Sequence, residues 1–443
     1  MNQFKDNQSI LLNPGMGWVM HTSIDKGHTD QNEFEPHPYI QVVALLSSWA
    51  KIEIDDGVFD FAELDEAIEK WSKLGKEIHL RISTDPMLYL NTAFGVPDYV
   101  FTKYHVPYQE KDTHGLKAKF PDYLNTKYLE LVYRFVDTLT TRYHQRSNIV
   151  LMDLRGYGEW GEWHSGYMHE TIEKHVLALR TVIQTWDKAC AGRIPLALSV
   201  SYEWRRNQSL SLFAPRSYNE YLYFSGFDYA LTKNTITLRR DGIGGALKYY
   251  DYEIFQDYFK NHHHHPLTTE FFMAYERQKD VIDGVRGYFA EDALEEALSL
   301  HPNYMMLMWD SKSFFNERQD LIEHGLKRLG YRLMPVEVDC KQVGDMVIID
   351  HHWVNLSVGR LYLKHECHIT LIDEQGKSYA FIDDQINLKS IIESKTKQYR
   401  SLFKLPNNSR IKSIKIGIYL VDIKVWMKMP LNEFSDNYVT ITL

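Results

Sequence analysis

The stretch Asn148-Ile-Val-Leu-Met-Asp-Leu-Arg-Gly-Tyr-Gly-Glu-Trp-Gly-Glu-Trp-His-Ser-Gly-Tyr167 is the most informative part of this chain. Its apolar first half is typical of a buried strand, and it ends abruptly in glycines, carboxylates and aromatic rings. Parallel strands carry such continuous apolar runs, and the residues that act on a ligand follow their ends. The glycines at positions 156, 158 and 161 indicate a close approach of the backbone to another group. The segment therefore predicts a parallel strand that leads into a functional site.

Composition narrows the class of protein. A chain of 443 residues is too long for a single small hydrophobic core, which predicts a large domain and a smaller one. A formal charge of −9 argues against nucleic-acid and anionic-membrane partners, which both need a basic face. Three cysteines without metal-ligand spacing do not indicate a disulfide framework. The first residues lack an apolar signal core and no stretch is long enough to span a membrane, so we expect a cytoplasmic protein, or a secreted one if a leader has been removed.

Strand-like and helix-like segments alternate over residues 1–330. Apolar stripes of helical period run from Phe61 to Leu74, Tyr128 to Leu139 and Ile172 to Trp186. Eight strands interleaved with helices predict an α/β fold, a (β/α)8 TIM barrel; an open doubly wound sheet is the alternative, but no Gly-rich phosphate loop opens the first helix. The predicted strands are Met16 to Met20, Val42 to Ser47, Ile78 to Ser83, Ile149 to Leu154, Ile194 to Ser199, Tyr221 to Phe227, Pro266 to Phe271 and Tyr304 to Trp309.

The pattern changes after Leu329. Residues 331–443 contain short alternating segments separated by turn formers, which predict a small all-β antiparallel sandwich. We expect this accessory domain to stabilise the barrel, with carbohydrate binding as the alternative. Its predicted strands are Met346 to Asp350, Arg360 to Lys364, His368 to Ile372, Ile414 to Val421 and Tyr438 to Leu443.

Two glutamates stand at strand ends that face each other across a barrel mouth. Glu162 follows the fourth predicted strand, and Glu270 lies on the seventh. Cleavage of a glycosidic bond needs two carboxylates, one to protonate the leaving oxygen and one to attack or to activate water. We expect Trp160 and Trp163 to raise the pKa of Glu162, and a cation such as Arg81 or Arg155 to keep Glu270 ionised.

Aromatic and polar side chains at the other strand ends are candidates for sugar binding. Aromatic faces can stack on sugar rings and carboxylates can bind hydroxyls, although core packing or helix capping explains each residue alone equally well. The candidate substrate-binding residues are Trp18, Trp49, Arg81, Asp85, Arg155, Tyr157, Glu159, Trp160, Trp163, His164, Trp204, Asp228, Asp241, Trp309 and Asp310.

Two further motifs suggest ligand sites on first inspection. The tract His262 to His265 precedes a strand, and four consecutive side chains cannot converge on one ion, so we expect a polar loop at the lower end of the barrel and no metal or other cofactor. The run Arg239-Arg-Asp-Gly-Ile-Gly-Gly245 lacks the Lys-Ser/Thr of a phosphate loop. We expect it to be a loop after a strand whose Arg and Asp line the cleft, which favours a charged or acidic sugar.

The segment from Trp49 through Gly57-Val-Phe-Asp-Phe61 into Gly75-Lys-Glu-Ile-His-Leu80 resembles clan A glycoside hydrolases. In that clan the acid/base glutamate follows strand four and the nucleophilic glutamate ends strand seven, which implies these roles for Glu162 and Glu270. The Asn that usually precedes the first glutamate is replaced by Gly161. A closer resemblance, to bacterial barrel proteins with a domain of unknown function, is carried by Asn13-Pro14-Gly15-Met16-Gly17, by Trp160 to His164 and by the C-terminal sandwich, and it favours Glu162 over Glu159.

These observations lead to three hypotheses. The first is a glycoside hydrolase that cleaves a β-linked oligo- or polysaccharide with two glutamates and retention of configuration. The second is a carbohydrate-binding protein on an inactive barrel, and the third is a lyase or transglycosidase. All three make a carbohydrate the partner, and none specifies the sugar or an oligomeric state.

Overall fold

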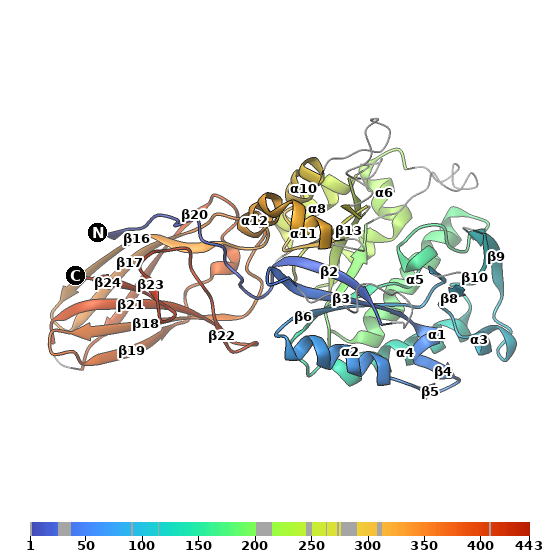
Figure 1. The fold of residues 1–443 in the computed structure, drawn as a ribbon, viewed down its shortest axis with the longest axis horizontal. Coiled ribbons are helices and arrows are strands. Elements are labelled where there is room, and N and C mark those ends of the chain that lie inside the picture. The colour runs from blue at the N-terminus through green and yellow to red at the C-terminus, as the bar shows by residue number, and fades with distance from the viewer. Residues whose placement is uncertain are drawn as a thin grey trace.

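The computed structural model describes residues 2–24, 37–89, 92–113, 115–200, 215–244, 250–262, 264–272, 274–275, 290–307, 312–406 and 409–443. Its two parts are a closed barrel surrounded by helices and a pair of antiparallel sheets beside it (Figure 1). The candidate residues Trp204, Trp309 and Asp310 lie outside the described residues.

Eight parallel strands close the barrel, and each strand pairs with its two neighbours around the ring. The last strand returns to the first through the pairing of Tyr304 with Gly17 and of Leu307 with Met20. The predicted TIM barrel is therefore confirmed. Its strands are β2 (Gly17–Ser23), β3 (Ile40–Ser48), β6 (Glu77–Ser83), β11 (Ile149–Leu154), β12 (Leu196–Ser199), β13 (Ile236–Ile243), β14 (Thr268–Phe271) and β15 (Tyr304–Leu307).

The helices bury their apolar stripes against the barrel. At the start of α4, Asn125 accepts a hydrogen bond from the Tyr128 N–H, and at the start of α5, Thr171 accepts one from the Lys174 N–H, so a polar side chain caps each helix. The helices are α1 (Trp49–Ile52), α2 (Ala62–Lys73), α3 (Asp98–Thr102), α4 (Thr126–Tyr143), α5 (Ile172–Cys190), α6 (Tyr218–Ser225), α7 (Phe227–Ala230), α8 (Asp251–Asn261), α10 (Ala290–Leu298), α11 (Lys312–Glu317) and α12 (Gln319–Arg328).

One predicted barrel strand is wrong. Tyr221 to Phe227 form α6 and the start of α7, separated by Gly226 at a φ of 75°. Ser217 starts α6 by accepting a hydrogen bond from the Glu220 N–H, so this aromatic run is helical despite its β propensity. The sixth strand is β13, which pairs in parallel with β12 and β14. Arg239 and Asp241 therefore belong to a strand and not to the predicted loop.

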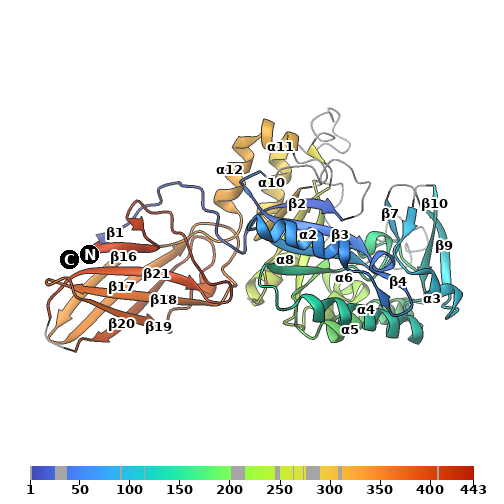
Figure 2. The same ribbon diagram turned by 60° about the horizontal axis from the view of Figure 1, so that its bottom comes forward.

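Short strands and a 3-10 turn lie in the segments that connect the barrel strands and helices. The hairpin β9–β10 and the segment of α3 lie at the end of the barrel away from the antiparallel sheets (Figure 2). These elements are β4 (Glu53–Asp55), β5 (Val58–Phe59), β7 (Met87–Tyr89), β8 (Thr92–Phe94), β9 (Tyr108–Thr113), β10 (Leu116–Pro121) and the 3-10 turn η1 (Glu159–Gly161).

Two antiparallel sheets form the predicted sandwich around their own apolar core, which includes Trp353, Ile369 and Ile416. The predicted strand Arg360 to Lys364 is wrong, because this segment lies between β17 and β18 without a ladder. One sheet contains β1 (Asn2–Gln3), β16 (Leu333–Val343), β17 (Met346–Asn355) and β20 (Thr396–Lys404). The other contains β18 (His365–Asp373), β19 (Ser378–Asp383), β21 (Ile411–Leu420), β22 (Val425–Trp426), β23 (Phe434–Ser435) and β24 (Tyr438–Thr442), and the 3-10 turn η3 (Leu388–Ser390) lies between β19 and β20.

The sandwich packs against the lower end of the barrel, where the parallel strands begin. Asn303, just before β15, donates hydrogen bonds to the carbonyls of Gly15 and Arg360, and Tyr304 shares a hydrogen bond with Tyr362. The carboxyl ends of the barrel strands, at the opposite end, are not covered by the sandwich (Figure 1).

The N-terminal residues join the sandwich rather than the barrel. β1 pairs with β16, and Asp6 forms an ion pair with Arg332. Both chain termini lie on the sandwich (Figure 1). The division into residues 1–330 and 331–443 stays a prediction. Among the described residues, no helix is both long and apolar enough to cross a membrane.

Candidate active site

A buried carboxylate organises three arginines inside the barrel. Asp153 on β11 accepts a hydrogen bond from Arg81 Nε at 3.0 Å and lies 3.2 Å from Arg239 Nε and 3.5 Å from Arg155 Nη1. His79 Nε2 contacts its other oxygen at 2.6 Å. Burial opposes ionisation of Asp153, but Arg239, His79 and Arg81 outweigh it and hold its pKa well below the usual range. A fixed negative charge therefore orients guanidinium groups from three strands.

The guanidinium groups connect the two predicted catalytic glutamates. Arg81 Nη2 lies 2.9 Å from Glu162 Oε1 and 3.0 Å from Glu270 Oε2. Because both oxygens contact one nitrogen, they are no more than about 6 Å apart. Arg239 also contacts Glu270, and its Nη2 lies 3.4 Å from Glu162 Oε1, whereas Arg155 Nη2 lies 3.2 Å from that oxygen. The structure thus brings Glu162, Glu270, Arg81 and Arg155 together, with Arg81 in contact with both glutamates and Arg155 in contact with Glu162.

Asp241 adds a third carboxylate to this cluster. It extends from β13, hydrogen-bonds with Glu162 and lies 3.8 Å from Arg239 Nη1. Two carboxyl groups can hydrogen-bond only if one of them carries a proton. Burial and the Asp241 charge raise the pKa of Glu162, whereas Arg239, the hydrogen bond with Glu162 and Arg81 together outweigh burial and lower the pKa of Asp241. The shared proton therefore resides on Glu162.

The loop that carries Glu162 needs its glycines. Gly158 has a φ of 82°, and a Cβ there would lie 1.8 Å from the His164 carbonyl oxygen. Gly161 has a φ of 69°, and its Cβ would lie 2.6 Å from the Arg155 backbone. An Asn, the residue usual in clan A at this position, would meet the same obstruction. The close approach of the backbone that these two glycines allow is therefore a contact between two parts of the same loop, and between the loop and the end of strand β11.

The hairpin β9–β10 holds this loop from outside. Gln109 exchanges two hydrogen bonds of 2.9 Å with the Met168 backbone, and Lys111 donates to the Gly166 carbonyl. From below, Asp85 accepts a hydrogen bond from the Tyr123 hydroxyl at 2.9 Å, and that hydroxyl accepts one from the Gly158 N–H at 3.2 Å. Burial raises the pKa of Asp85 well above the usual range, so Asp85 is an internal support and not a surface group for sugar hydroxyls.

Two other predicted residues lie beside the carboxylates. Trp160 is partly exposed at a φ of 57°, and its ring lies 5.8 Å from that of His164. His164 is near enough to Asp241 to lower the pKa of that carboxyl, after the larger effects of burial and Arg239. Glu159 is buried in the same loop, close to Lys111.

The structure places the remaining candidates away from the carboxylates. Trp18 is buried and donates a hydrogen bond to the Ile322 carbonyl, and Trp49 is buried and donates to Glu53. Trp163 and Tyr157 pack edge to face in the core, 5.6 Å between ring centroids. Asp228 forms an ion pair with Arg180 on the outer helical layer. These side chains stabilise the barrel and do not wall the cluster.

Asp153 and His79 are not among the predicted site residues, and Arg239 is predicted to lie on a loop rather than on a strand. A signal was present, because His79, Arg81 and Ser83 alternate with apolar residues along β6, and Asp153 interrupts an apolar strand. Polar side chains at every second position of a barrel strand point to one side. Arg239 was read as part of a cleft-lining loop, but it is 0% exposed and engaged by carboxylates, so it no longer argues for an acidic sugar.

Comparison with known proteins finds a family match for part of the chain and remote structural neighbours. Residues 29–175 match a glycoside hydrolase family 42 model, described as beta-galactosidase. No curated protein matches the chain in sequence. The chain is similar in structure to endo-glycoceramidase II from Rhodococcus sp., at 12% identity over 91% of this chain and 100% of that chain, with a TM-score of 0.42.

Two other solved structures are remotely similar. The catalytic domain of beta-amylase from Paenibacillus polymyxa is 11% identical over 66% of this chain and 92% of its own, with a TM-score of 0.42. A family 30 subfamily 8 xylanase from Clostridium acetobutylicum is 10% identical over 91% and 95%, with a TM-score of 0.37. The fold assignment rests on the closed barrel, and the family match lies on its first half. The closed barrel and the match over residues 29–175 support a clan A-like glycoside hydrolase barrel.

Proposed function

We propose that this enzyme hydrolyses a β-linked oligo- or polysaccharide with retention of configuration, with Glu270 as nucleophile and Glu162 as acid and base. The observation that carries the proposal is the shared contact of Arg81 Nη2 with both carboxylates. This contact keeps Glu162 Oε1 and Glu270 Oε2 within about 6 Å of each other, which supports the short carboxyl separation of roughly 5–5.5 Å typical of retaining enzymes. Inverting enzymes separate the two groups by roughly 6.5–9.5 Å to admit a water molecule.

In the first step, Glu270 attacks the anomeric carbon while the bond to the leaving oxygen breaks. Glu162 gives its proton to that oxygen, so the first product leaves as an alcohol and the sugar becomes an ester of Glu270. Arg81 donates to Glu270 Oε1 at 3.0 Å, which fixes the carboxylate in position. The contact with Asp241 keeps the proton on Glu162 until a substrate arrives.

In the second step, Glu162 is ionised and acts as a base. It takes a proton from water, the hydroxide attacks the anomeric carbon, and the bond to Glu270 breaks. Glu270 leaves as a carboxylate, and the guanidinium groups of Arg81 and Arg239 stabilise the returning negative charge. Glu162 is then protonated again, and the free enzyme is restored.

The proposal is tested with a panel of 4-nitrophenyl β-glycosides and three variants. Glu162→Gln and Glu270→Gln should each lower turnover by at least about 1,000-fold while the unfolding transition stays cooperative. Asp228→Asn, on the outer layer, is the matched control and should keep wild-type turnover. Proton NMR of the sugar, recorded as it is released and before mutarotation, should show the β-anomer. An α-anomer, or full activity of either glutamine variant, contradicts the proposal.

We propose a structural role for the sandwich. It contacts the strand beginnings through Asn303, Tyr304 and Tyr362, at the end of the barrel opposite to Glu162 and Glu270. A sugar held between the two glutamates therefore has no contact with the sandwich. Substitution of Tyr362 by Phe should lower the melting temperature while KM for an aryl glycoside stays at the wild-type value.

A further inference from the structure

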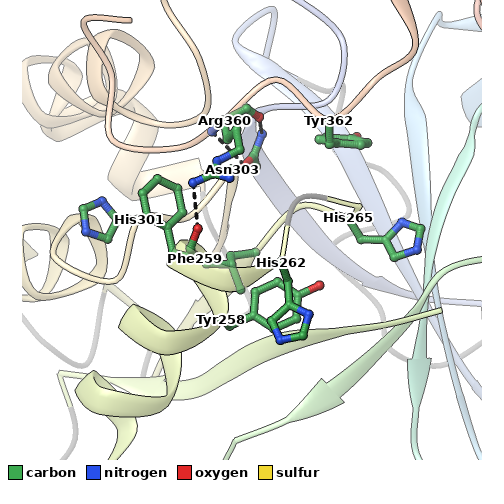
Figure 3. A pocket seen from close by; sticks show the side chains of 9 residues that line it. Tyr258, Phe259, His262, His265, His301, Asn303, Arg360 and Tyr362 are labelled. Carbon is green, nitrogen blue, oxygen red and sulfur yellow. Dashed lines mark hydrogen bonds between the residues drawn. The ribbon is translucent and has the colours of Figure 1, made fainter. Parts of the chain in front are cut away.

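A small cavity lies where the sandwich meets the lower end of the barrel (Figure 3). Arg360 reaches into it from the segment between β17 and β18, and its Nη2 donates a hydrogen bond of 2.6 Å to the Phe259 carbonyl at the end of α8. The described residues that line the cavity are Tyr258, Phe259, His262, His265, Leu267, His301, Asn303, Arg360 and Tyr362.

The charge of Arg360 has no counter-ion among the described residues. Arg360 is 6% exposed, and no described carboxylate forms an ion pair with it. Its Nε has no hydrogen-bond partner within the described part of the chain. Burial lowers the pKa of Arg360 to about 10, which still leaves it charged at neutral pH. A buried charge is strongly unfavourable unless an opposite charge compensates it.

The neighbours of Arg360 do not supply that opposite charge. The guanidinium carbon lies 4.4 Å over the Phe259 ring, whose other neighbour is the His301 ring at 4.3 Å. Burial lowers the pKa of His265, and Lys389 lowers it further, so the surroundings contribute cationic and neutral groups. Glu393, which raises the pKa of His301 against burial, is itself bound by Arg328 at 2.8 Å. The C-terminal dipole of α8 compensates only part of a unit charge.

The size of the cavity limits what can fill it. The centre of a water-sized sphere can occupy about 10 Å³ within it, so the cavity has room for a single small species. Water would satisfy the free donor but would leave the charge uncompensated. We propose that this cavity binds one monatomic anion of chloride size, held by the Arg360 guanidinium. The anion joins the sandwich to the barrel by neutralising a cation that the sandwich inserts beneath β14 and β15.

The site is tested first by crystallography on the wild-type protein. Crystals grown with sodium bromide in place of chloride should show an anomalous difference peak within contact distance of Arg360 Nε and Nη1. A map with no peak at Arg360 overturns the proposal. This experiment needs no substitution and so does not depend on how well a variant folds.

The second test compares melting temperatures in sodium chloride and in sodium methanesulfonate, whose larger anion the cavity excludes, at equal ionic strength. Chloride should raise the melting temperature of the wild type by a few degrees, because a ligand of the native state stabilises it. Arg360→Met should abolish this difference. Arg400→Met, which removes an exposed arginine from the same sandwich, is the matched control and should retain it. An equal chloride effect in Arg360→Met and the wild type overturns the proposal.

Discussion

Replacing Asp241 by Asn should shift the pH dependence of hydrolysis. Glu162 must be protonated to act as the acid, and the Asp241 charge helps burial to raise its pKa. Activity is therefore present below the raised pKa and is lost as the pH rises through it. Removal of the neighbouring charge lowers that pKa, so the alkaline limb should move to lower pH.

The size of the shift follows from the geometry. Two unit charges about 4 Å apart interact by about 4 kcal/mol at an effective dielectric constant of about 20. Arg239, 3.8 Å from Asp241 and 3.4 Å from Glu162, compensates part of this repulsion. We expect a net shift of about 1–2 pKa units, at about 1.4 kcal/mol per unit.

The assay is the pH profile of kcat/KM on a 4-nitrophenyl glycoside and on the 2,4-dinitrophenyl glycoside of the same sugar. The 2,4-dinitrophenolate leaving group needs little protonation, so the shift of the alkaline limb should be smaller with the 2,4-dinitrophenyl glycoside. Asp228→Asn should leave both profiles unchanged, because Asp228 pairs with Arg180 on the outer layer. An alkaline limb of Asp241→Asn that stays in place or moves to higher pH would refute this reasoning.

Three further predictions concern stability and loop geometry. Asp153→Asn removes a buried charge shared by Arg81, Arg155 and Arg239, and should lower the free energy of unfolding by about 3–5 kcal/mol in denaturant titrations; a loss below about 1 kcal/mol contradicts the account. Gly158→Ala should lower kcat by about 100-fold, because the new Cβ would clash with the His164 carbonyl and the loop would have to move. Gly57 has a similar φ but open space around it, so Gly57→Ala should lower the free energy of unfolding by only about 1 kcal/mol. Equal effects of the two substitutions on kcat contradict this explanation. Burial raises the pKa of Glu77 to about 7, so the folded chain retains a proton that an unfolded glutamate releases above about pH 4.3. The contribution of Glu77 to stability should therefore be smaller by about 1–3 kcal/mol at about pH 7 than at about pH 4.3, and Glu77→Gln should remove this contribution from the slope of stability against pH; identical slopes in the variant and the wild type contradict it.

Most of the barrel could be predicted because its strands are continuous apolar runs. The sixth strand was the exception, since β13 carries Arg239, Arg240 and Asp241, and a run of charges does not look like a buried strand. Ion pairs fill the interior of this barrel at the candidate site, so an apolar pattern cannot identify the strand that carries their charged residues. The rival segment Tyr221 to Phe227 has strand-like composition, but a Ser217 cap and a Gly226 terminus make it helical.

The part of the candidate site that could be predicted consists of charged residues at strand ends, because the expected reaction needs carboxylates there. Strand positions predict a pair of glutamates, the family resemblance favours Glu162 over Glu159 as the partner of Glu270, and Arg81 or Arg155 is predicted beside Glu270. The tryptophans could not be sorted, because a ring that packs in the core and a ring that binds sugar have the same sequence signature. Trp18 and Trp49 are fully buried, and only the fold shows this. The position of Asp153 beneath three arginines likewise depends on which strands are neighbours.

The most direct test of the central claim is to trap the covalent intermediate on Glu270. The wild-type enzyme is incubated with the 2,4-dinitrophenyl 2-deoxy-2-fluoro-β-glycoside of the sugar it turns over best, then digested and analysed by mass spectrometry. The account predicts one fluoroglycosyl group, attached to the peptide that contains Glu270. An adduct on another residue, or no adduct in an enzyme that hydrolyses the parent aryl glycoside, would contradict it.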